Sequence, residues 1–380
     1  MSGITLTRVS KSYVSGLLAV KNLDLDIPEG SFTCLLGPSG CGKTTTLRMI
    51  AGLEHPTDGE ITVDDRVLDS VPRGIYVPPE RRSMGLVFQS YALWPHLTVA
   101  KNVEFGLRVK KAPAAERRAR VGEALKLMQI DHLADRYPAQ LSGGQQQRVS
   151  LARMLAVDPT VLLLDEPLSN LDARLRLEMR AELKRLHDAT GHTFVLVTHD
   201  QIEAMTMATH VAVMHDGVLE QMAAPMEVYD RPATRFVAEF VGSPPMNFVD
   251  PGGSGPAAES LRRHLVAAGF DPATAAHVGV RPEALHLATF AGAADGGVPD
   301  GAWSFPATVA TVLPTGSSTT VSLTAGVDTI FLTAFAEVGV PTGGTVTCYA
   351  RDSDLHLFDD QDRRLSSWDN RPARILQEVR

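Results

Sequence analysis

A glycine-rich segment near the N-terminus has the spacing of a phosphate-binding loop. Its residues are Gly37, Pro38, Ser39, Gly40, Cys41, Gly42, Lys43 and Thr44, which fit GxxxxGK[ST] and follow an apolar run at 32–36. Glycines let amide N–H groups turn inward around phosphate, and the helix expected at 45–52 adds the positive end of its dipole. Lys43 would bridge the β- and γ-phosphates, Thr44 would bind Mg²⁺, and Thr45 completes the contacting run. The pattern predicts a Mg-ATP site, whereas a plain Gly-rich turn would match it by chance in roughly one chain in a hundred.

Two adjacent carboxylates follow a second apolar run. Residues 161–164 read Val-Leu-Leu-Leu, and Asp165 and Glu166 come directly after them. Open α/β sheets gather their ligands at the carboxyl ends of their strands. Beside a phosphate loop, Asp165 would hold Mg²⁺ through its water shell, and Glu166 would be the general base that polarises the attacking water. A solvated strand end is the alternative.

A third segment, Leu141-Ser142-Gly143-Gly144-Gln145, opens a helical run expected at 146–156. Its hydroxyl and glycine amides would stand at a helix amino end, which attracts anions. Ser142 could equally be a plain N-cap without further function. Only the combination with the other two segments favours a second phosphate-binding device.

The elements that must position these residues alternate short apolar runs with longer helical stretches, as in an α/β fold. Strands are expected at 32–36, 86–88, 161–164 and 194–197. Runs that are apolar on both faces predict central parallel strands. Alternating residues at 22–27 predict a half-exposed antiparallel edge, so the sheet should be mixed. No strand signal occurs between 98 and 157, where stretches such as 114–129 predict a helical subdomain over about 90–157.

The composition changes after Phe240. Gly- and Pro-rich stretches at 242–245 and 251–256 are typical of a linker. Short β-runs at 319–323, 329–332 and 346–350 follow, and they predict a small barrel-like domain. We therefore expect an α/β domain over residues 1–240 and a β-rich domain over residues 241–380.

Overall composition limits the remaining function classes. A length of 380 residues suits two domains, and the net charge of −8, from 36 basic and 44 acidic residues, argues against general coating of nucleic acid. Without a run of about 18 apolar residues or a secretory signal, we expect a cytosolic chain that does not span a membrane. Three cysteines without CxxC spacing predict neither a disulfide framework nor a metal site. Cys41 lies at a helix start beside the expected phosphates, which can lower a thiol pKa, although a small filler is the simpler interpretation.

The phosphate loop, LSGGQ and LLLDEP, in this order, resemble the nucleotide-binding subunit of ATP-binding cassette (ABC) transporters. The resemblance implies a P-loop NTPase fold and an ATPase that uses ATP and Mg²⁺. It also implies that Tyr13 stacks on adenine, Gln89 senses Mg²⁺ and the attacking water, Asp172 communicates across a dimer, and His199 contacts the γ-phosphate. Packing of Tyr13 and simple exposure of His199 are the alternatives.

The resemblance also implies an assembly. Two subunits sandwich two ATP molecules head to tail, each held by the phosphate loop of one chain and the LSGGQ segment of the other, and hydrolysis lets the dimer open. Residues 88–96 would seat a short helix of a membrane subunit, although core packing of Phe88, Tyr91 and Trp94 is equally open. This segment lacks interleaved basic residues, so no nucleic-acid partner is expected.

The tail narrows the family. Segments 241–248, 279–283 and 355–359 look like those of importer ATPases of the maltose, multiple-sugar and glycerol-3-phosphate type. This implies a regulatory domain of the transport-associated oligonucleotide-binding (TOBE) type, two membrane permease subunits, an extracytoplasmic solute-binding protein acting indirectly, and a peripheral location on the cytoplasmic face of the inner membrane. Residues 292–301 and 314–316 depart from the barrel pattern of that family.

Sugars are the favoured cargo. Glycerol-3-phosphate, polyamines and ferric iron stay open. Outside this class, a soluble cassette ATPase acting on nucleic acid or ribosomes and a purely regulatory sugar-responsive protein are the alternatives.

Overall fold

The computed structural model describes residues 2–14, 16–88, 90–289, 297–335 and 338–366. The chain divides into two compact units, Met1–Val228 and Tyr229–Arg380. The domain boundary at residue 240, which rests on composition, stays a prediction. Within the residues described, no helix combines the length and apolar character needed to cross a bilayer.

A six-stranded mixed sheet forms the centre of the first unit. Its order is β11-β10-β3-β9-β8-β7, and all neighbours are parallel except β11, which is antiparallel to β10. The strands are β3 (Phe32–Leu36), β7 (Met84–Val87), β8 (Val161–Asp165), β9 (Thr193–Thr198), β10 (His210–His215) and β11 (Val218–Ala223). Every residue of β3, β8 and β9 is buried. The predicted central parallel strands and the mixed sheet are confirmed.

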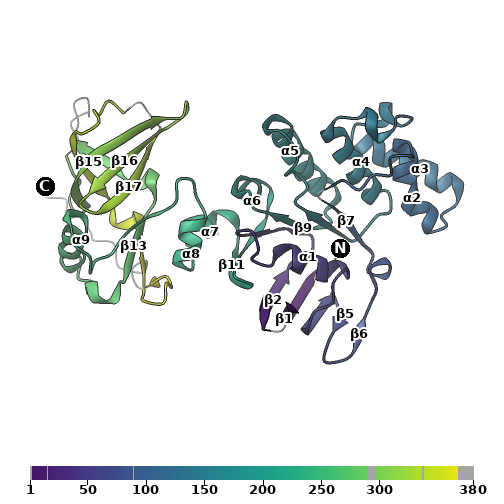
Figure 1. Ribbon diagram of the computed structural model, residues 1–380, viewed down its shortest axis with the longest axis horizontal. Coiled ribbons are helices and arrows are strands. Elements are labelled where there is room, and N and C mark those ends of the chain that lie inside the picture. The colour runs from purple at the N-terminus through teal and green to yellow at the C-terminus, as the bar shows by residue number, and fades with distance from the viewer. Residues whose placement is uncertain (1, 15, 89, 290–296, 336–337, 367–380) are drawn as a thin grey trace, which may run out of the picture. The chain divides into compact units, whose positions relative to one another are not determined.

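A five-stranded antiparallel sheet, ordered β2-β1-β4-β5-β6, forms a second layer. Its strands are β1 (Ile4–Val14), β2 (Leu17–Ile27), β4 (Asp58–Val63), β5 (Arg66–Ser70) and β6 (Ile75–Tyr76). Alternate residues at the end of β2 are buried and exposed, as its sequence predicted for an edge strand. Helix α1 (Lys43–Ala51) lies between the two sheets, because its apolar residues share one core with both. The other face of the central sheet is covered by α5 (Ala173–Thr190), whose His187 ring packs 5.3 Å from the rings of Phe32 and Phe194 (Figure 1).

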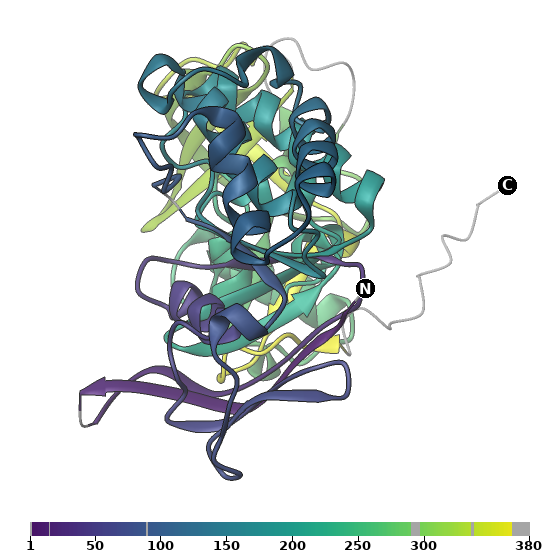
Figure 2. The same ribbon diagram turned by 90° about the vertical axis from the view of Figure 1, so that its right-hand side faces the viewer.

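Three helices fill the interval in which no strand was expected. They are α2 (Val99–Val109), α3 (Ala114–Leu127) and α4 (Gly143–Leu155), with 3-10 turns at Asp131–Leu133 and Pro138–Gln140. Figures 1 and 2 show this helical segment at the opposite end of the first unit from the antiparallel sheet. The predicted helical insertion is confirmed. Helix α4 begins three residues before the expected start at 146, because Ser142 and Gln145 cap its first turn reciprocally.

The second unit is mostly antiparallel β-structure. Its sheets are ordered β12-β13-β19 and β14-β18-β15-β16-β17. The strands are β12 (Asn247–Val249), β13 (His277–Val280), β14 (His286–Thr289), β15 (Trp303–Pro314), β16 (Thr319–Ala325), β17 (Asp328–Ala334), β18 (Thr345–Ala350) and β19 (Leu355–Phe358). The five-stranded sheet curls around a core that contains the buried rings of Trp303 and Phe305. The β-rich, barrel-like prediction is confirmed in this form.

Helices also contribute to this part of the chain. Short helices α7 (Pro225–Asp230) and α8 (Arg235–Phe240) come before the first strand. Helix α9 (Pro256–Ala267) was not predicted, and it buries Ala257, Ala258, Leu261 and Leu265 in the core of the second unit. It begins directly at the end of the linker-like stretch, where proline suits the first turn of a helix.

The two departures from the barrel pattern have different outcomes. Pro314 is the last residue of β15, and Thr315 and Gly316 begin the turn to β16, where the N–H of Thr315 donates to the carbonyl of Ser318 at 2.8 Å. Of the other departure, at 292–301, residues 292–296 lie outside the described part of the chain.

A buried ion pair ties the antiparallel sheet to the end of α1. Arg82 Nη2 lies 3.0 Å from Asp69 Oδ2, and both side chains are fully buried. Arg82 Nη1 donates to the carbonyls of Met49 and Ile50, at 2.8 and 3.0 Å, in the last turn of the helix. The guanidinium therefore satisfies carbonyl groups that a helix end leaves without partners.

Replacing Arg82 by Gln is expected to lower the free energy of unfolding by about 3–5 kcal/mol, because the buried Asp69 carboxylate would lose the guanidinium and, among the described residues, keep only the His55 ring, 2.7 Å from Oδ1. Chemical denaturation followed by circular dichroism measures the change. The control is Arg73→Gln, which breaks an exposed pair with Glu60 at 3.1 Å and should cost less than about 1 kcal/mol. Equal losses in the two variants would contradict this account of the buried pair.

Candidate active site

The phosphate loop leaves the carboxyl end of β3 and enters α1. Gly42 is the residue before the helix, with φ of 98°, and a Cβ atom there would lie 2.6 Å from the carbonyl oxygen of Ala19. Only glycine fits both the conformation and the close approach. Gly37 is buried at the start of the loop, Pro38 is half-buried, and Ser39 and Gly40 are exposed at its tip. The loop therefore opens to solvent at the amino end of a helix, as its sequence predicted.

Lys43 directs its charge into this loop. Its Nζ donates to the carbonyl oxygens of Gly37 at 2.7 Å and Pro38 at 2.8 Å, and the residue is only 5% exposed. The ammonium group is thus held beside the inward-facing backbone. A bridge from Lys43 to the β- and γ-phosphates stays a prediction.

The strand β8 brings a carboxylate to the phosphate loop. Thr44 Oγ1 donates to Asp165 Oδ1 at 3.2 Å, although 121 residues separate them in the sequence. Burial raises the pKa of Asp165, while the hydrogen bond from Thr44 and the charge of Arg48 lower it. The pair supplies two oxygen donors, which are the ligands that Mg²⁺ prefers. Among the described residues, no group of three or more His, Cys, Asp or Glu side chains could hold a metal ion.

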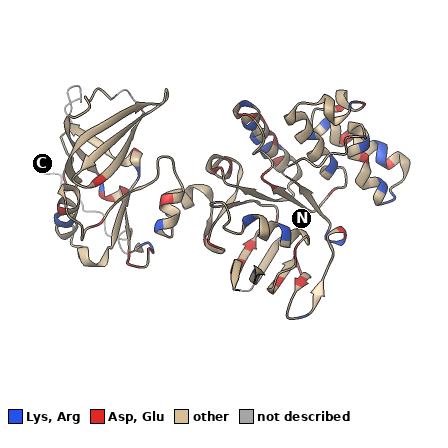
Figure 3. Ribbon diagram, in the orientation of Figure 1, with Lys and Arg blue, Asp and Glu red and all other residues tan. Residues whose placement is uncertain are grey.

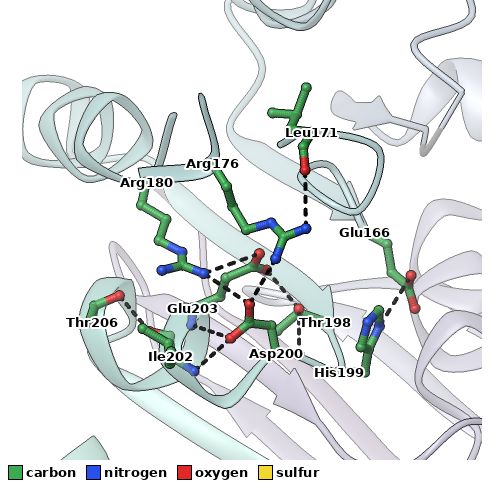
Figure 4. Close-up of polar contacts among 10 residues, drawn as sticks. All are labelled: Glu166, Leu171, Arg176, Arg180, Thr198, His199, Asp200, Ile202, Glu203 and Thr206. Carbon is green, nitrogen blue, oxygen red and sulfur yellow. Dashed lines mark hydrogen bonds and ion pairs between the residues drawn. The ribbon is translucent and has the colours of Figure 1, made fainter. Parts of the chain in front are cut away.

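Glu166 turns away from the strand that precedes it. Its φ of 44° is unusual for a residue with a side chain, and its N–H donates to the carbonyl of Val197 in β9 at 3.0 Å. His199 Nδ1 lies 3.4 Å from Glu166 Oε2, with side-chain exposures of 58% and 24% (Figure 4). The ends of β8 and β9 therefore bring together the carboxylate and the imidazole, and both face solvent in part.

Tyr13 lies next to the first turn of α1. Its hydroxyl contacts Thr45 Oγ1 at 3.2 Å and donates to the carboxylate of Glu54. Partial burial and the neighbouring Glu54 raise the pKa of Tyr13. Because the residue is 58% exposed, it has an aromatic surface on which a base could stack.

The LSGGQ segment and Asp172 both lie against Leu175. Ser142 accepts from the N–H of Gln145 at 3.4 Å, and the Gln145 side chain accepts from the N–H of Ser142 at 3.0 Å. A Cβ atom at Gly144 would lie 2.5 Å from Leu175 Cδ1. Asp172 accepts from the N–H of the same Leu175 at 2.9 Å as the N-cap of α5.

The capping interpretation of Ser142 is therefore realised, and so is a cap at Asp172. Ser142 and Gly143 are nevertheless exposed. Their contact with a phosphate of a second chain, and the role of Asp172 across a dimer, stay predictions.

The expected coupling segment is only partly packed. Trp94 stacks on Phe105 with ring centroids 4.0 Å apart, and the guanidinium of Arg153 lies 4.9 Å from the indole. Arg153 also donates to the carbonyls of Tyr91 and Ala92, whereas Phe88 is 37% exposed. The contact of residues 88–96 with a membrane subunit stays a prediction. Gln89, expected to sense Mg²⁺ and the attacking water, lies outside the described residues.

Four charged residues next to His199 escaped the sequence reasoning. They are Arg176, Arg180, Asp200 and Glu203, whose side chains contact one another next to the loop that carries His199 (Figure 4). The spacing of the two arginines, four residues apart in a helical stretch, and the acidic residues just after Thr198 and His199 were the available signals.

Cys41 does not have the activated thiol that its position at a helix start allowed. The residue is 2% exposed, and burial raises its pKa in spite of the nearby Lys43 ammonium. Desolvation disfavours the thiolate more than the lysine stabilises it. The idea of a lowered pKa is wrong, and the filler interpretation is the correct one.

We expect the folded chain to resist alkylation by iodoacetamide at pH 8, because all three cysteines are buried. Mass spectrometry should show labelling slowed by roughly tenfold or more relative to the same chain in denaturant. Fast modification of Cys41 in the folded chain would contradict its buried, protonated state.

Comparisons with known proteins agree with this geometry. The family model described as ABC transporter matches residues 20–169, and the TOBE domain model matches residues 278–358. The trehalose/maltose import ATP-binding protein MalK of Thermococcus litoralis is 53% identical over 250 residues, which are 66% of this chain and 67% of that protein. The sn-glycerol-3-phosphate import ATP-binding protein UgpC of Rhodopseudomonas palustris is 41% identical over 378 residues, 96% of this chain and 99% of that protein.

A solved structure is similar in fold to 58% of this chain. The dimeric post-hydrolysis state of the ATP-binding cassette MJ0796, bound to ADP and Pi, is 37% identical, has a TM-score of 0.51, and covers 58% of this chain and 98% of that one. The P-loop α/β fold, the nucleotide-binding motifs and the TOBE domain thus occur together. This chain belongs to the family of ABC-transporter ATP-binding proteins and is an ATPase.

Proposed function

We propose that this chain is the ATP-hydrolysing subunit of a bacterial importer that works as a homodimer on two membrane permease subunits. The observation that carries the proposal is the convergence of Lys43, Asp165 and Glu166 at one edge of the central sheet. Phosphoryl transfer to water requires groups of these kinds. Lys43 is a charged amine, Asp165 is a carboxylate hydrogen-bonded to Thr44, and Glu166 is a partly exposed carboxylate beside His199. The relatives named for import of trehalose/maltose and of sn-glycerol-3-phosphate favour transport as the use of that reaction.

Each residue has its own task in this scheme. Loop amides and Lys43 bind the phosphates, and Tyr13 stacks on the adenine. Thr44 and Asp165 would hold Mg²⁺, and Gln89 is proposed to sense the ion and the attacking water. When bound, the ion would neutralise charge on the phosphates. Glu166 accepts a proton from the attacking water, and His199 orients the γ-phosphate.

The dimer completes the site. Ser142 and Gly143 are exposed at the amino end of α4, so a second copy related by two-fold symmetry can present them to a γ-phosphate. Asp172, at the start of α5, would face the same interface. Loss of the γ-phosphate removes the charge that joins the copies, and the dimer opens. Residues 88–96, around Trp94, would receive a short helix of the permease.

Carbohydrate is the proposed cargo, supplied through an extracytoplasmic solute-binding protein, and the chain would be peripheral on the cytoplasmic face of the membrane. Glycerol-3-phosphate is the second candidate, because a relative of that name aligns with nearly the whole chain. Polyamines and ferric iron are the remaining alternatives. The second unit, with its TOBE domain, would regulate the dimer.

Reconstitution tests cargo and class together. The chain is co-purified with its membrane partners and binding protein in lipid vesicles, and ATPase stimulation is measured with sugars, glycerol-3-phosphate, polyamines and ferric iron. Stimulation by a sugar supports the proposal. Stimulation by nucleic acid, with none by the permeases, would replace it with a soluble cassette ATPase.

Replacing Glu166 by Gln is expected to lower kcat for ATP hydrolysis by about 10²–10⁴-fold, because the general base is lost while the phosphate contacts remain. Light scattering should show dimers of this variant in the presence of Mg-ATP. The matched control is Glu178→Gln, which affects only a surface pair with Arg174. Wild-type turnover in Glu166→Gln would remove the residue from the mechanism.

Replacing Lys43 by Ala should weaken Mg-ATP binding by roughly 10- to 100-fold, since a charged donor to the phosphates disappears. Isothermal titration with a non-hydrolysable analogue measures the affinity. Lys184→Ala, which breaks an exposed pair with Asp188, is the control and should bind normally. An unchanged affinity in Lys43→Ala would refute the assignment.

A further inference from the structure

The loop that carries His199 is short and its histidine makes little contact of its own. It joins the end of β9 at Thr198 to α6 (Gln201–Met207), and His199 is more than half exposed. The position of the imidazole relative to Glu166 therefore depends on how the two flanking residues are held. Thr198 is 3% exposed, and Asp200 is the N-cap of α6.

Both flanking residues belong to one hydrogen-bonded group. Thr198 Oγ1 donates to Glu203 Oε2 at 2.7 Å and accepts from the N–H of Asp200 at 3.0 Å. Asp200 Oδ1 in turn accepts from the N–H of Ile202 at 2.8 Å and from the N–H of Glu203 at 3.3 Å (Figure 4). Hydrogen bonds within the loop and the start of α6 therefore fix the residues on both sides of His199.

Two arginines of α5 fix this group to the neighbouring helix. Arg180 Nη2 donates to Asp200 Oδ2 at 2.9 Å and lies 4.0 Å from Glu203 Oε1. Arg176 Nη1 lies 3.7 Å from the same Asp200 oxygen. The arginines stand four residues apart, so they share one face of the helix. Two cations and two carboxylates therefore balance in a part-buried cluster, where electrostatic attraction is stronger than at an open surface.

Arg176 also reaches a second loop. Its Nη2 donates to the carbonyl oxygen of Leu171 at 3.1 Å, directly before Asp172. The same guanidinium therefore contacts the residue after His199 and the residue before Asp172. Figure 3 shows that α5 carries other basic residues, but Arg174, for example, is 90% exposed and pairs only with Glu178 among the contacts described.

We propose that Arg176 and Arg180 are positioning residues of the ATPase reaction, which hold His199 beside Glu166 through Asp200 and join its loop to the segment before Asp172. The inference rests on the proposed role of His199 at the γ-phosphate. If both loops face a second copy of the chain, Arg176 makes them move together. A change at the dimer interface would then reach the imidazole within one chain. The merely structural alternative is that the cluster only anchors α5 to the sheet.

The test separates rate from binding. In Arg176→Gln, kcat should fall by roughly tenfold or more while KM for ATP stays near the wild-type value, because the phosphate loop and Tyr13 are untouched. Rates are expressed per nucleotide-binding site, so a partly unfolded sample does not imitate the effect. Arg174→Gln, on the same helix, is the control and should keep both constants.

A double-mutant cycle with His199→Ala identifies the route. If Arg176 acts through the imidazole, Arg176→Gln should lower kcat little further once His199 is absent. Full additivity of the two effects would overturn the proposal. Wild-type turnover in His199→Ala alone would instead refute the role of the histidine, which is a separate failure.

A conservative substitution covers the case in which the glutamine variant does not fold. Arg176→Lys keeps the charge near Asp200 but has no fork with which to contact both acceptors. Its kcat should lie between those of the wild type and Arg176→Gln, or fall several-fold if only the lysine variant can be purified. A lysine variant with wild-type kcat and a lowered melting temperature would assign the cluster to stability alone.

Discussion

The placement of two carboxylates beside the phosphate loop is the constraint on which the proposed active site depends. Asp165 and Glu166 lie at the edge of the sheet where the phosphate loop opens, so a bound triphosphate would meet two acidic groups at close range. Lys43 contributes only one positive charge within the loop. In the proposed mechanism, a divalent cation held at Thr44 and Asp165 would resolve this conflict, since it would give one carboxylate a favourable partner and leave Glu166 to accept a proton.

Strand burial is what makes that placement possible. The apolar strands β3, β8 and β9 are buried along their whole length, as is typical of the centre of a sheet covered on both faces. Because they are parallel, their carboxyl ends lie at the same edge of the sheet. For this reason Thr44 and Asp165 could be assigned to one Mg²⁺ from sequence, whereas their hydrogen bond and the contact of Glu166 with His199 come from the structure. The LSGGQ segment could be located but not fully interpreted, because a good N-cap and an anion site use the same serine and the same helix end.

Other features depend on packing that the sequence does not express. The arginine cluster depends on which face of α5 packs against the loop that carries His199. In this packing Arg176 contacts both Leu171 and Asp200. Helix α9 was missed because its start coincides with the end of a Gly- and Pro-rich stretch, so composition concealed a favourable proline at the first turn. Cys41 was favoured as a small filler, and its burial agrees; the alternative of a lowered thiol pKa fails because a helix start lowers that pKa only if the sulfur keeps contact with water. The predicted domain boundary at residue 240 rests on the same kind of compositional signal.

One measurement tests directly whether a triphosphate joins two copies of this chain. A crystal structure of the chain with Mg²⁺ and a non-hydrolysable ATP analogue would show which groups surround the γ-phosphate. The account predicts Lys43 of one protomer on one side and Ser142 of the partner subunit on the other. If the analogue is bound by the phosphate loop while Ser142 and Gly143 face solvent in every arrangement of the copies, the account is contradicted.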